Sequence, residues 1–344
     1  MTAITHDLPN AAGADVVPDV PPPGLQETPR TLWGDAWKRL RSSVTSQICM
    51  GIVAIYVLVG LASLLPYFDR KINEPWNQDR TYAPPTLFTH DAQGHRHLAP
   101  PALWLGLEFQ GRSVFWRVLY GTRIALLITV CASILSLGIG TVLGVIAGFY
   151  GGWIDDLITW LFSTVSSIPW LLLVIAMAYA LQGNESPQFM QEHPKLQQLF
   201  GGVTTVILAL GLTDWVNLCR LMRGEVIKLR DRDFVAAGRT MGLSNFRILF
   251  RHILPNTTHL IIITFSLGAV AYVQVEVVLA FLGLGITDKP SWGKMIDDAK
   301  LELLRGVWWQ VTAATVAIFI LCLALNILGD ALRDALDPRL RGVD

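Results

Sequence analysis

Residues 233–256 read DFVAAGRTMGLSNFRILFRHILPN and separate two long hydrophobic blocks, although this segment is itself basic and rich in small residues. Gly242 is expected to separate two short helical pieces, and Pro255 to stop the second piece before the next block. The pattern predicts a helix–turn–helix on a membrane surface with one exposed face. That face belongs either to an ordinary cytosolic loop or to a docking surface, which a partner would bind as a groove binds an amphipathic helix. The apolar side chains expected on the two pieces are Phe234, Met241, Phe246, Leu249 and Phe250.

The composition of the chain indicates a membrane protein. Of 344 residues, 52% are hydrophobic and only 16% are charged, and the mean hydropathy is +0.45. The 27 basic and 27 acidic residues cancel, so no overall field favours nucleic acid as a partner. The four cysteines are scattered singly and form neither a disulfide framework nor metal-ligand spacing: Cys49, Cys131, Cys219 and Cys322.

Six blocks are long and apolar enough to cross a bilayer as helices, since a span needs about 20 mostly apolar residues. They cover residues 47–66, 124–148, 157–181, 201–219, 259–286 and 309–329. The expected fold is an all-α membrane protein with six transmembrane helices. Pro169 interrupts the third block, and a neighbouring helix together with the hydroxyls of Ser166 and Ser167 is expected to satisfy the backbone groups that it frees.

The segments between the spans define the expected organisation. Residues 1–30 contain acids and prolines without an apolar run, which predicts a disordered cytosolic tail rather than a signal peptide. The remaining segments are an N-terminal segment with the first span (31–66), an extracytoplasmic loop (67–123), a five-helix core (124–333) that includes a cytosolic loop (220–258), and a cytosolic C-terminal tail (334–344).

Basic residues predict the orientation in the membrane. The segment from Arg220 to Arg251 holds eight Lys and Arg residues against three acids, which places it in the cytosol by the positive-inside rule. The long loop 67–123 holds seven basic residues and five acids, but long loops weigh little in that rule. Basic residues beside the first and last spans place both termini in the cytosol as well: Lys38, Arg39 and Arg41, and Arg333, Arg339 and Arg341.

The second span contains glycines at four-residue spacing: Gly140, Gly144, Gly148 and Gly152. Such a face allows another helix to approach closely, because packing must drive association where lipid offers no hydrophobic gain. Helix packing is the favoured interpretation, and a glycine-lined substrate path is the alternative. The sequence contains no Gly-x-x-x-x-Gly-Lys-Ser/Thr loop, so the chain is not expected to bind ATP through a P-loop.

The opening segment resembles the cytoplasmic-loop motif of ABC-importer permeases. That motif reads Glu-Ala-Ala, three residues, Gly, nine residues, Ile, one residue, Leu-Pro. Four positions match it: Ala237, Gly242, Leu254 and Pro255. Three positions depart from it, since Ala236 stands for Glu, Gly238 for Ala and His252 for Ile. The missing Glu weakens the case for a specific salt bridge to the ATPase.

The resemblance extends from residue 31 to the C-terminus and narrows to the oligopeptide/dipeptide/nickel permease group, where the chain is most similar to the C-type subunit. The sequence GRSVFWRVLYGTRIAL has Ser113 where the group has Asp, and Gly106-Leu107-Glu108 stands where it has Gly-Thr-Asp. The other matching segments are TLWGDAWKRLRSS (31–43), AGFYGGWIDD (147–156), RLMRGEVIKLRDRDFV (220–235), LAFLGLGITDKPSWGKMIDDA (279–299) and NILGDALRDALDPRL (326–340).

The resemblance implies a type I ABC-importer permease in a bacterial or archaeal cell membrane. Such a chain is not an enzyme: it forms half of a pore with a second permease, and two cytosolic ATPase subunits hold the ATP and Mg²⁺. An extracytoplasmic binding protein delivers the substrate, and closure of the ATPases moves the docking loop and switches the pore. The implied docking residues are Ala236, Ala237, Gly238, Arg239, Gly242, Arg247, His252, Leu254 and Pro255.

Peptides are the substrate class that the resemblance favours, with nickel or another small solute as the alternative. A stand-alone secondary transporter is a further alternative, and inverted internal repeats with broken helices in paired positions would indicate it. An intramembrane enzyme is disfavoured, because no Ser/His set or His-Glu-x-x-His motif occurs within the spans.

Ionisable residues inside spans are candidates for the substrate path. Glu276, with Gln274 beside it, is the favoured one, and an interhelical bond is an equally weighted alternative. Asp214 is the second candidate, although a position near the cytosolic end would let it pair with Arg220 or with solvent. Ser166 and Ser167 complete the candidate path, and Trp170 is expected to pack rather than line it.

His90, His95 and His97 lie in one polar loop and raise the question of a metal site. A closed site needs three or four well-placed ligands with supporting groups around them. A glycine-containing polar loop with three histidines is more often solvated, so no metal site is predicted.

Overall fold

The computed structural model describes residues 34, 40–73, 81–90, 96–182, 202–286 and 289–336, and helices dominate them. Of the expected tails, residues 1–30 and 337–344 lie outside the described residues, and the first residues of the expected tail 334–344 continue the last helix to Leu336. Within the described part, five helices are long and apolar enough to cross a membrane, and a sixth span results if one bent pair is counted as a unit. The all-α membrane fold is therefore confirmed.

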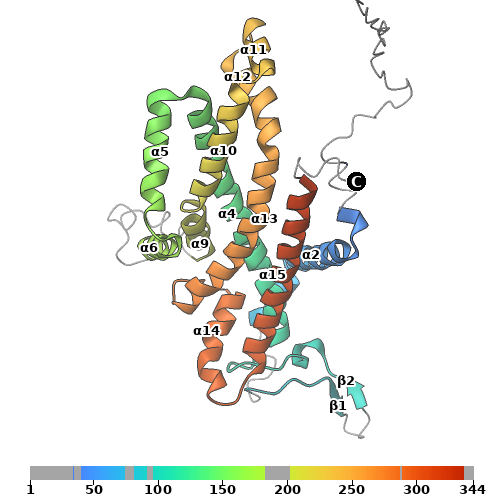
Figure 1. Ribbon diagram of the computed structural model, residues 1–344. Coiled ribbons are helices and arrows are strands. Elements are labelled where there is room, and N and C mark those ends of the chain that lie inside the picture. The colour runs from blue at the N-terminus through green and yellow to red at the C-terminus, as the bar shows by residue number, and fades with distance from the viewer. Residues whose placement is uncertain are drawn as a thin grey trace, which may run out of the picture.

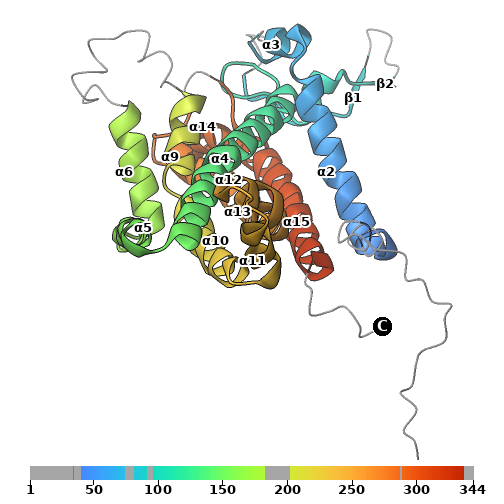
Figure 2. The same cartoon turned by 90° about the horizontal axis from the view of Figure 1, so that it is seen from above.

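The spans follow one another in chain order. They are α2 (Val44–Ala62), α4 (Val114–Tyr150), the bent pair α5 (Gly152–Ser166) and α6 (Trp170–Gln182), the pair α9 (Val203–Gly211) and α10 (Trp215–Arg230), the helix that ends in α13 (Leu254–Phe281), and α15 (Trp309–Leu336). Helices α4, α10, α13 and α15 form the centre, with α2 on one side and α5 and α6 on the other (Figure 2).

Smaller elements lie at the two ends of this bundle (Figure 1). At one end are α11 (Asp233–Thr240) and α12 (Asn245–Ile248). At the opposite end are α14 (Trp292–Leu303) and the antiparallel strands β1 (Phe88–His90) and β2 (Arg96–Leu98). The segment before α4 also contains α3 (Pro66–Asn73) and the 3₁₀ turn η1 (Pro101–Leu103).

The glycines of α4 form its contact with α10. A β-carbon on Gly140, Gly144 or Gly148 would lie within 2.8 Å of a backbone oxygen of α10. The backbones approach so closely that no larger side chain fits, which confirms helix packing as the role of these three positions. Gly152 does not belong to this face, because it follows the turn at Gly151 (φ +66°) and a β-carbon added to it would have no atom within 4 Å.

The third span is broken rather than kinked. Helices α5 and α6 meet at 89°, so the single helix expected over 157–181 is wrong. Proline cannot donate a backbone hydrogen bond, and its ring clashes with the preceding turn, so α5 ends before Pro169. The hydroxyl of Ser167 donates to the carbonyl of Thr164 at 2.7 Å, as expected of a helix end in a membrane. The hydroxyl of Ser166 instead accepts from Arg220 at 2.9 Å.

Two spans are longer than their apolar runs. Helix α4 begins at Val114 rather than at 124, because the arginine of its first turn, Arg117, is buried against acidic partners. Helix α10 continues to Arg230, well beyond the expected end at 219, so the first part of the expected loop 220–258 is helical. A hydropathy window ends a span where charge begins, whereas the helix itself continues.

Pro255 does not stop a helix, contrary to the expectation. Helix α12, the π-helical turn η2 (Leu249–Ile253) and α13 follow each other without interruption, and together they form one long helix. Pro255 is the second residue of α13, two residues after the π turn ends. The wide π turn just before it gives the proline ring room against the carbonyl of the preceding turn.

Candidate functional site

The end of the molecule that contains α11, α12 and η2, here called the docking end, is rooted in the bundle. Val235, Ile248 and Ile253 are buried in a cluster with Val226 of α10 and Phe149 of α4. Arg239 lies over the Phe149 ring at 5.7 Å. These contacts fix the docking end as a rigid extension of α4, α10 and α13. A force applied to it therefore reaches three spans through packed side chains.

Gly242 sets the angle between α11 and α12. Its φ is +75°, a left-handed conformation that glycine adopts without steric cost. The N–H of Leu243 bonds the carbonyl of Gly238 at 3.0 Å, and the N–H of Gly242 bonds the carbonyl of Arg239 at 3.0 Å. This pattern is a Schellman C-cap, and Ser244 then caps α12 by accepting from the N–H of Arg247. The predicted division at Gly242 is confirmed.

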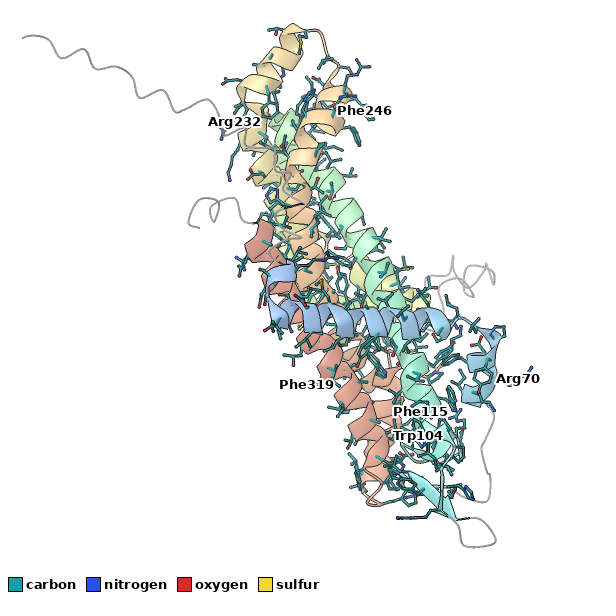
Figure 3. All side chains as sticks on the ribbon, turned by 90° about the vertical axis from the view of Figure 1, so that its right-hand side faces the viewer. Arg70, Trp104, Phe115, Arg232, Phe246 and Phe319 are labelled. Atoms are coloured by element: carbon teal, nitrogen blue, oxygen red, sulfur yellow. The ribbon has the colours of Figure 1, made fainter. Side chains whose placement is uncertain are left out.

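The docking end presents an apolar face with a basic rim. Met241, Phe246 and Phe250 are 72%, 68% and 55% exposed, and the last two rings lie 4.3 Å apart. Figure 3 shows Phe246 at this extremity, far from Trp104 and Phe115. An open pocket of about 550 Å³ lies beside the rings, lined by Ser244, Phe246, Arg247, Phe250, Arg251 and Pro255. Exposed aromatic side chains on a rigid support are typical of a protein-binding surface.

The other motif positions are placed differently. Ala236 and Ala237 are exposed, whereas Gly238 is buried and faces Ile248. Two of these three small residues are therefore accessible. His252 is half-buried with its ring 6.5 Å from that of Phe234. Of the apolar side chains expected on the two pieces, Leu249 alone is buried.

A second site lies where two spans are interrupted. The gap between α5 and α6 and the gap between α9 and α10 face each other across a pocket of about 240 Å³, here called the break pocket. Ser166 and Asp214, both predicted for the substrate path, line it. Thr213 and Asn217 line it too and were not predicted, because an isolated amide or hydroxyl in an apolar run gives no signal in the sequence. The remaining lining residues are Val165, Ile168, Pro169, Trp170, Leu173 and Val216.

Asp214 accepts a hydrogen bond from the Tyr272 hydroxyl at 2.7 Å, and that hydroxyl also faces Ser136 of α4. The expected partner Arg220 binds Ser166 instead and lies 5.5 Å from the Phe162 ring. Asp214 lies at the break between α9 and α10, and α10 begins beside it and runs on to Arg230. Asp214 is thus held inside the span by a polar contact from α13.

Glu276 lies outside the break pocket. It is 2% exposed, and its carboxylate faces the hydroxyl of Ser291 and the N–H of Gly293 at the first turn of α14. A carboxylate at a helix N-terminus complements the free N–H groups and the helix dipole. This position matches the alternative that Glu276 makes an interhelical bond, although its partner is a helix terminus rather than an arginine. Gln274 is exposed on α13, and Ser167 is exposed at the end of α5.

The histidine loop gives no ligand cluster within the described residues. The described part of the chain holds no group of three His, Cys, Asp or Glu side chains placed to bind a metal ion. His97 pairs with Thr89 in the β1–β2 hairpin, and its side chain is exposed. His95 lies outside the described residues.

An ion network joins the segment before α4 to α14. Glu108 is fully buried and pairs with Arg112 and with Arg117, and Arg117 reaches Asp298 at 3.4 Å. Asp298 also lies 2.8 Å from Lys294. The hydrogen bond to Asp298 is the main reason why the pKa of Lys294 lies above its ordinary value. The Gly-Leu-Glu sequence at 106–108 is therefore a structural element of this end.

Several known proteins are similar to this chain in sequence. Residues 140–342 match the family model described as "Binding-protein-dependent transport system inner membrane component". The chain is 34% identical to the dipeptide transport system permease protein DppC of Bacillus subtilis over 89% of this chain and 86% of the relative. It is 33% identical to the oligopeptide permease protein OppC of the same organism, over 90% and 91% of the two chains. The glutathione permease protein GsiD of Pectobacterium atrosepticum is 31% identical over 91% and 93%. The chain belongs to the family of binding-protein-dependent transport system inner membrane components.

Proposed function

We propose that this chain is one of two permease subunits in an ATP-driven importer of peptides. The observation on which this rests is the docking end: exposed Met241, Phe246 and Phe250 on a rigid extension of three spans. Relatives named as dipeptide, oligopeptide and glutathione permeases support peptides as the substrate class. A second permease completes the pore, and an extracytoplasmic binding protein supplies the substrate.

The docking end is proposed to bind a cytosolic ATPase subunit, which holds the ATP and Mg²⁺. Apolar rings with arginines around them fit a groove that is apolar at its centre and acidic at its edge. Ala236 stands where the motif has glutamate, so this contact has no carboxylate at that position. Burial of apolar surface therefore contributes the larger part of its binding free energy. The orientation that follows from this proposal places the docking end and both termini in the cytosol.

Reconstituted transport tests the proposal. The permease pair, its ATPases and its binding protein are placed in liposomes, and ATP-driven uptake of tritiated Ala-Ala is measured. Phe246→Ala and Arg247→Glu are expected to lower uptake at least tenfold and to reduce the ATPase that co-purifies. Phe319→Ala is the matched control, because Phe319 is 63% exposed on α15 and far from the docking end (Figure 3). Normal uptake by both docking variants, or uptake without any ATPase, would overturn the proposal.

Orientation is tested separately with single cysteines in a cysteine-free background. Met241→Cys is expected to react with an impermeant maleimide only from the cytosolic side. His97→Cys, at the other end of the molecule, is expected to react only from outside. The reverse pattern would contradict the proposed orientation.

A further inference from the structure

Helix α10 has a row of polar side chains within its span. Asp214 precedes the helix, Asn217 follows three residues later and Arg220 three residues after that, so each is a surface neighbour of the next. Asp214 is half-buried in the break pocket, and the other two are exposed on the surface of this chain. An ionisable group inside a span does not face lipid, because the cost is several kcal/mol per charge. Asp214 and Asn217 of this row face the break pocket.

Neither charge in the row is neutralised. In the part of the chain that the structure describes, Asp214 has no ion pair and is bonded only by Tyr272, and Arg220 has no ion pair and is bonded only to Ser166. Arg223 of the same helix is a contrast, since its guanidinium binds both oxygens of Asp155, with Nη2 2.7 Å from Oδ2. A structural charge in this helix is thus paired, whereas Asp214 and Arg220 keep their charges available.

The surroundings hold Asp214 in place for a ligand. The contact from Tyr272, itself against Ser136, fixes the carboxylate at the pocket wall and leaves one oxygen with no hydrogen bond from the described residues. Ser166 lines the same pocket and positions Arg220 at its margin. The indole N–H of Trp170 is also buried in the wall without an acceptor among the described residues. The pocket wall therefore offers an anion and a free donor, and a cation is bonded to one of its lining side chains, Ser166.

We propose that the break pocket is a transient binding site for a zwitterionic peptide, with Asp214 binding its α-ammonium group and Arg220 its terminal carboxylate. Six residue steps separate them, a rise of about 9 Å along α10. A peptide extends by about 3.3–3.6 Å per residue, so two or three residues fit between the two charges. Charge-assisted hydrogen bonds at both ends would select free termini, and a cargo carbonyl would accept from Trp170. This inference rests on the proposed function.

Binding to the purified complex tests the site. The complete permease–ATPase complex in nanodiscs, without its binding protein, is dialysed against tritiated Ala-Ala, N-acetyl-Ala-Ala or Ala-Ala-amide. The wild-type complex is expected to prefer Ala-Ala at least tenfold over both derivatives. Asp214→Asn is expected to abolish the preference over the N-acetyl form, and Arg220→Gln the preference over the amide. Glu225→Gln, which removes an acid of α10 outside the pocket, is expected to behave as wild type.

The preference ratio is independent of the fraction of complex that folds, so a poorly folding variant still gives an answer. Wild-type preferences in both Asp214→Asn and Arg220→Gln would overturn the site while leaving peptide import intact. A wild-type system that takes up no peptide in liposomes would overturn the proposed function and this site together. A preference lost equally in Glu225→Gln would also overturn the assignment, because the effect would not be specific to the pocket.

Discussion

Gly144 of α4 lies so close to Met222 of α10 that a β-carbon on the glycine would be 2.7 Å from the β-carbon of Met222, and 2.6 Å from the carbonyl oxygen of Cys219. Real β-carbons do not approach other atoms to that extent. The two helices that connect the docking end to the membrane core are thus held together at a contact that depends on a missing side chain.

Gly144→Val is expected to destabilise the chain by about 1–3 kcal/mol, because the helices must separate or shift to admit the new methyl groups. The thermal unfolding midpoint of the purified complex measures this. Gly138→Ala is the control: it lies on the same helix with no atom within 4 Å of the added carbon, and is expected to be neutral or slightly stabilising. Equal midpoints for the two variants would contradict the close-packing explanation.

Replacing Arg117 alone is expected to destabilise the chain more than replacing Arg117 and Glu108 together. Arg117→Met leaves Glu108 buried without its deep partner, and breaking a buried pair costs about 3–5 kcal/mol. The double variant Arg117→Met/Glu108→Gln removes both charges and is expected to recover much of that loss. Unfolding midpoints of the two singles and the double form a double-mutant cycle. A double variant as unstable as the sum of the singles would show that the two residues do not interact.

The sequence predicts what depends on local pattern. Six apolar runs correspond to six spans, and the glycine at 242 with its neighbours predicts the turn at the docking end. Charge near a span misleads the prediction: Arg117 and the residues beyond 219 continue helices, because partners from elsewhere in the fold bind the charges. Pro255 misleads it as well, because a π turn absorbs the proline without ending the helix.

The break pocket depends on contacts that are distant in sequence. Asp214 could be identified as an intramembrane acid, but its bond to Tyr272 joins residues 58 positions apart, and local spacing pointed to Arg220 or solvent as its partner. Glu276 could be identified for the same reason, yet its neighbours Ser291 and Gly293 belong to the start of α14, a helix too short and polar to be recognised as a span. A charged residue inside a span is thus a candidate for the substrate path. The tertiary structure then separates the candidates with a structural role from those that a substrate can reach.

The charged side chains of α14 predict that the stability of the chain depends on pH. Burial alone would raise the pKa of Asp297, but hydrogen bonds from Lys300 and Lys294 outweigh burial and lower it. A lowered pKa means that the stabilisation is present above the ordinary aspartate pKa of about 3.9 and is lost as the pH falls through the lower, folded value. Asp297→Asn is therefore expected to reduce the unfolding midpoint at pH 7, by an amount equivalent to about 1 kcal/mol or less, and to match wild type in stronger acid.

Thermal unfolding between pH 3 and pH 7 measures this difference. Asp334→Asn, an exposed position on the last turns of α15, is the control and is expected to follow wild type throughout. A difference for Asp297→Asn that stays constant down to pH 3 would mean that the carboxylate does not contribute through its charge.

Gly242 is expected to matter for coupling rather than for membrane insertion. Its φ of +75° costs a β-branched residue about 1–2 kcal/mol, and the space around it is open, so strain rather than a clash is the predicted effect. Gly242→Val is expected to change the angle between α11 and α12 and to lower peptide taken up per ATP hydrolysed at least threefold, with normal amounts of protein in the membrane. Gly242→Asn should be milder, since asparagine tolerates left-handed backbone. Gly224→Ala, at a helical glycine with equally open surroundings, is the control, and the same loss of coupling there would refute the role of the turn.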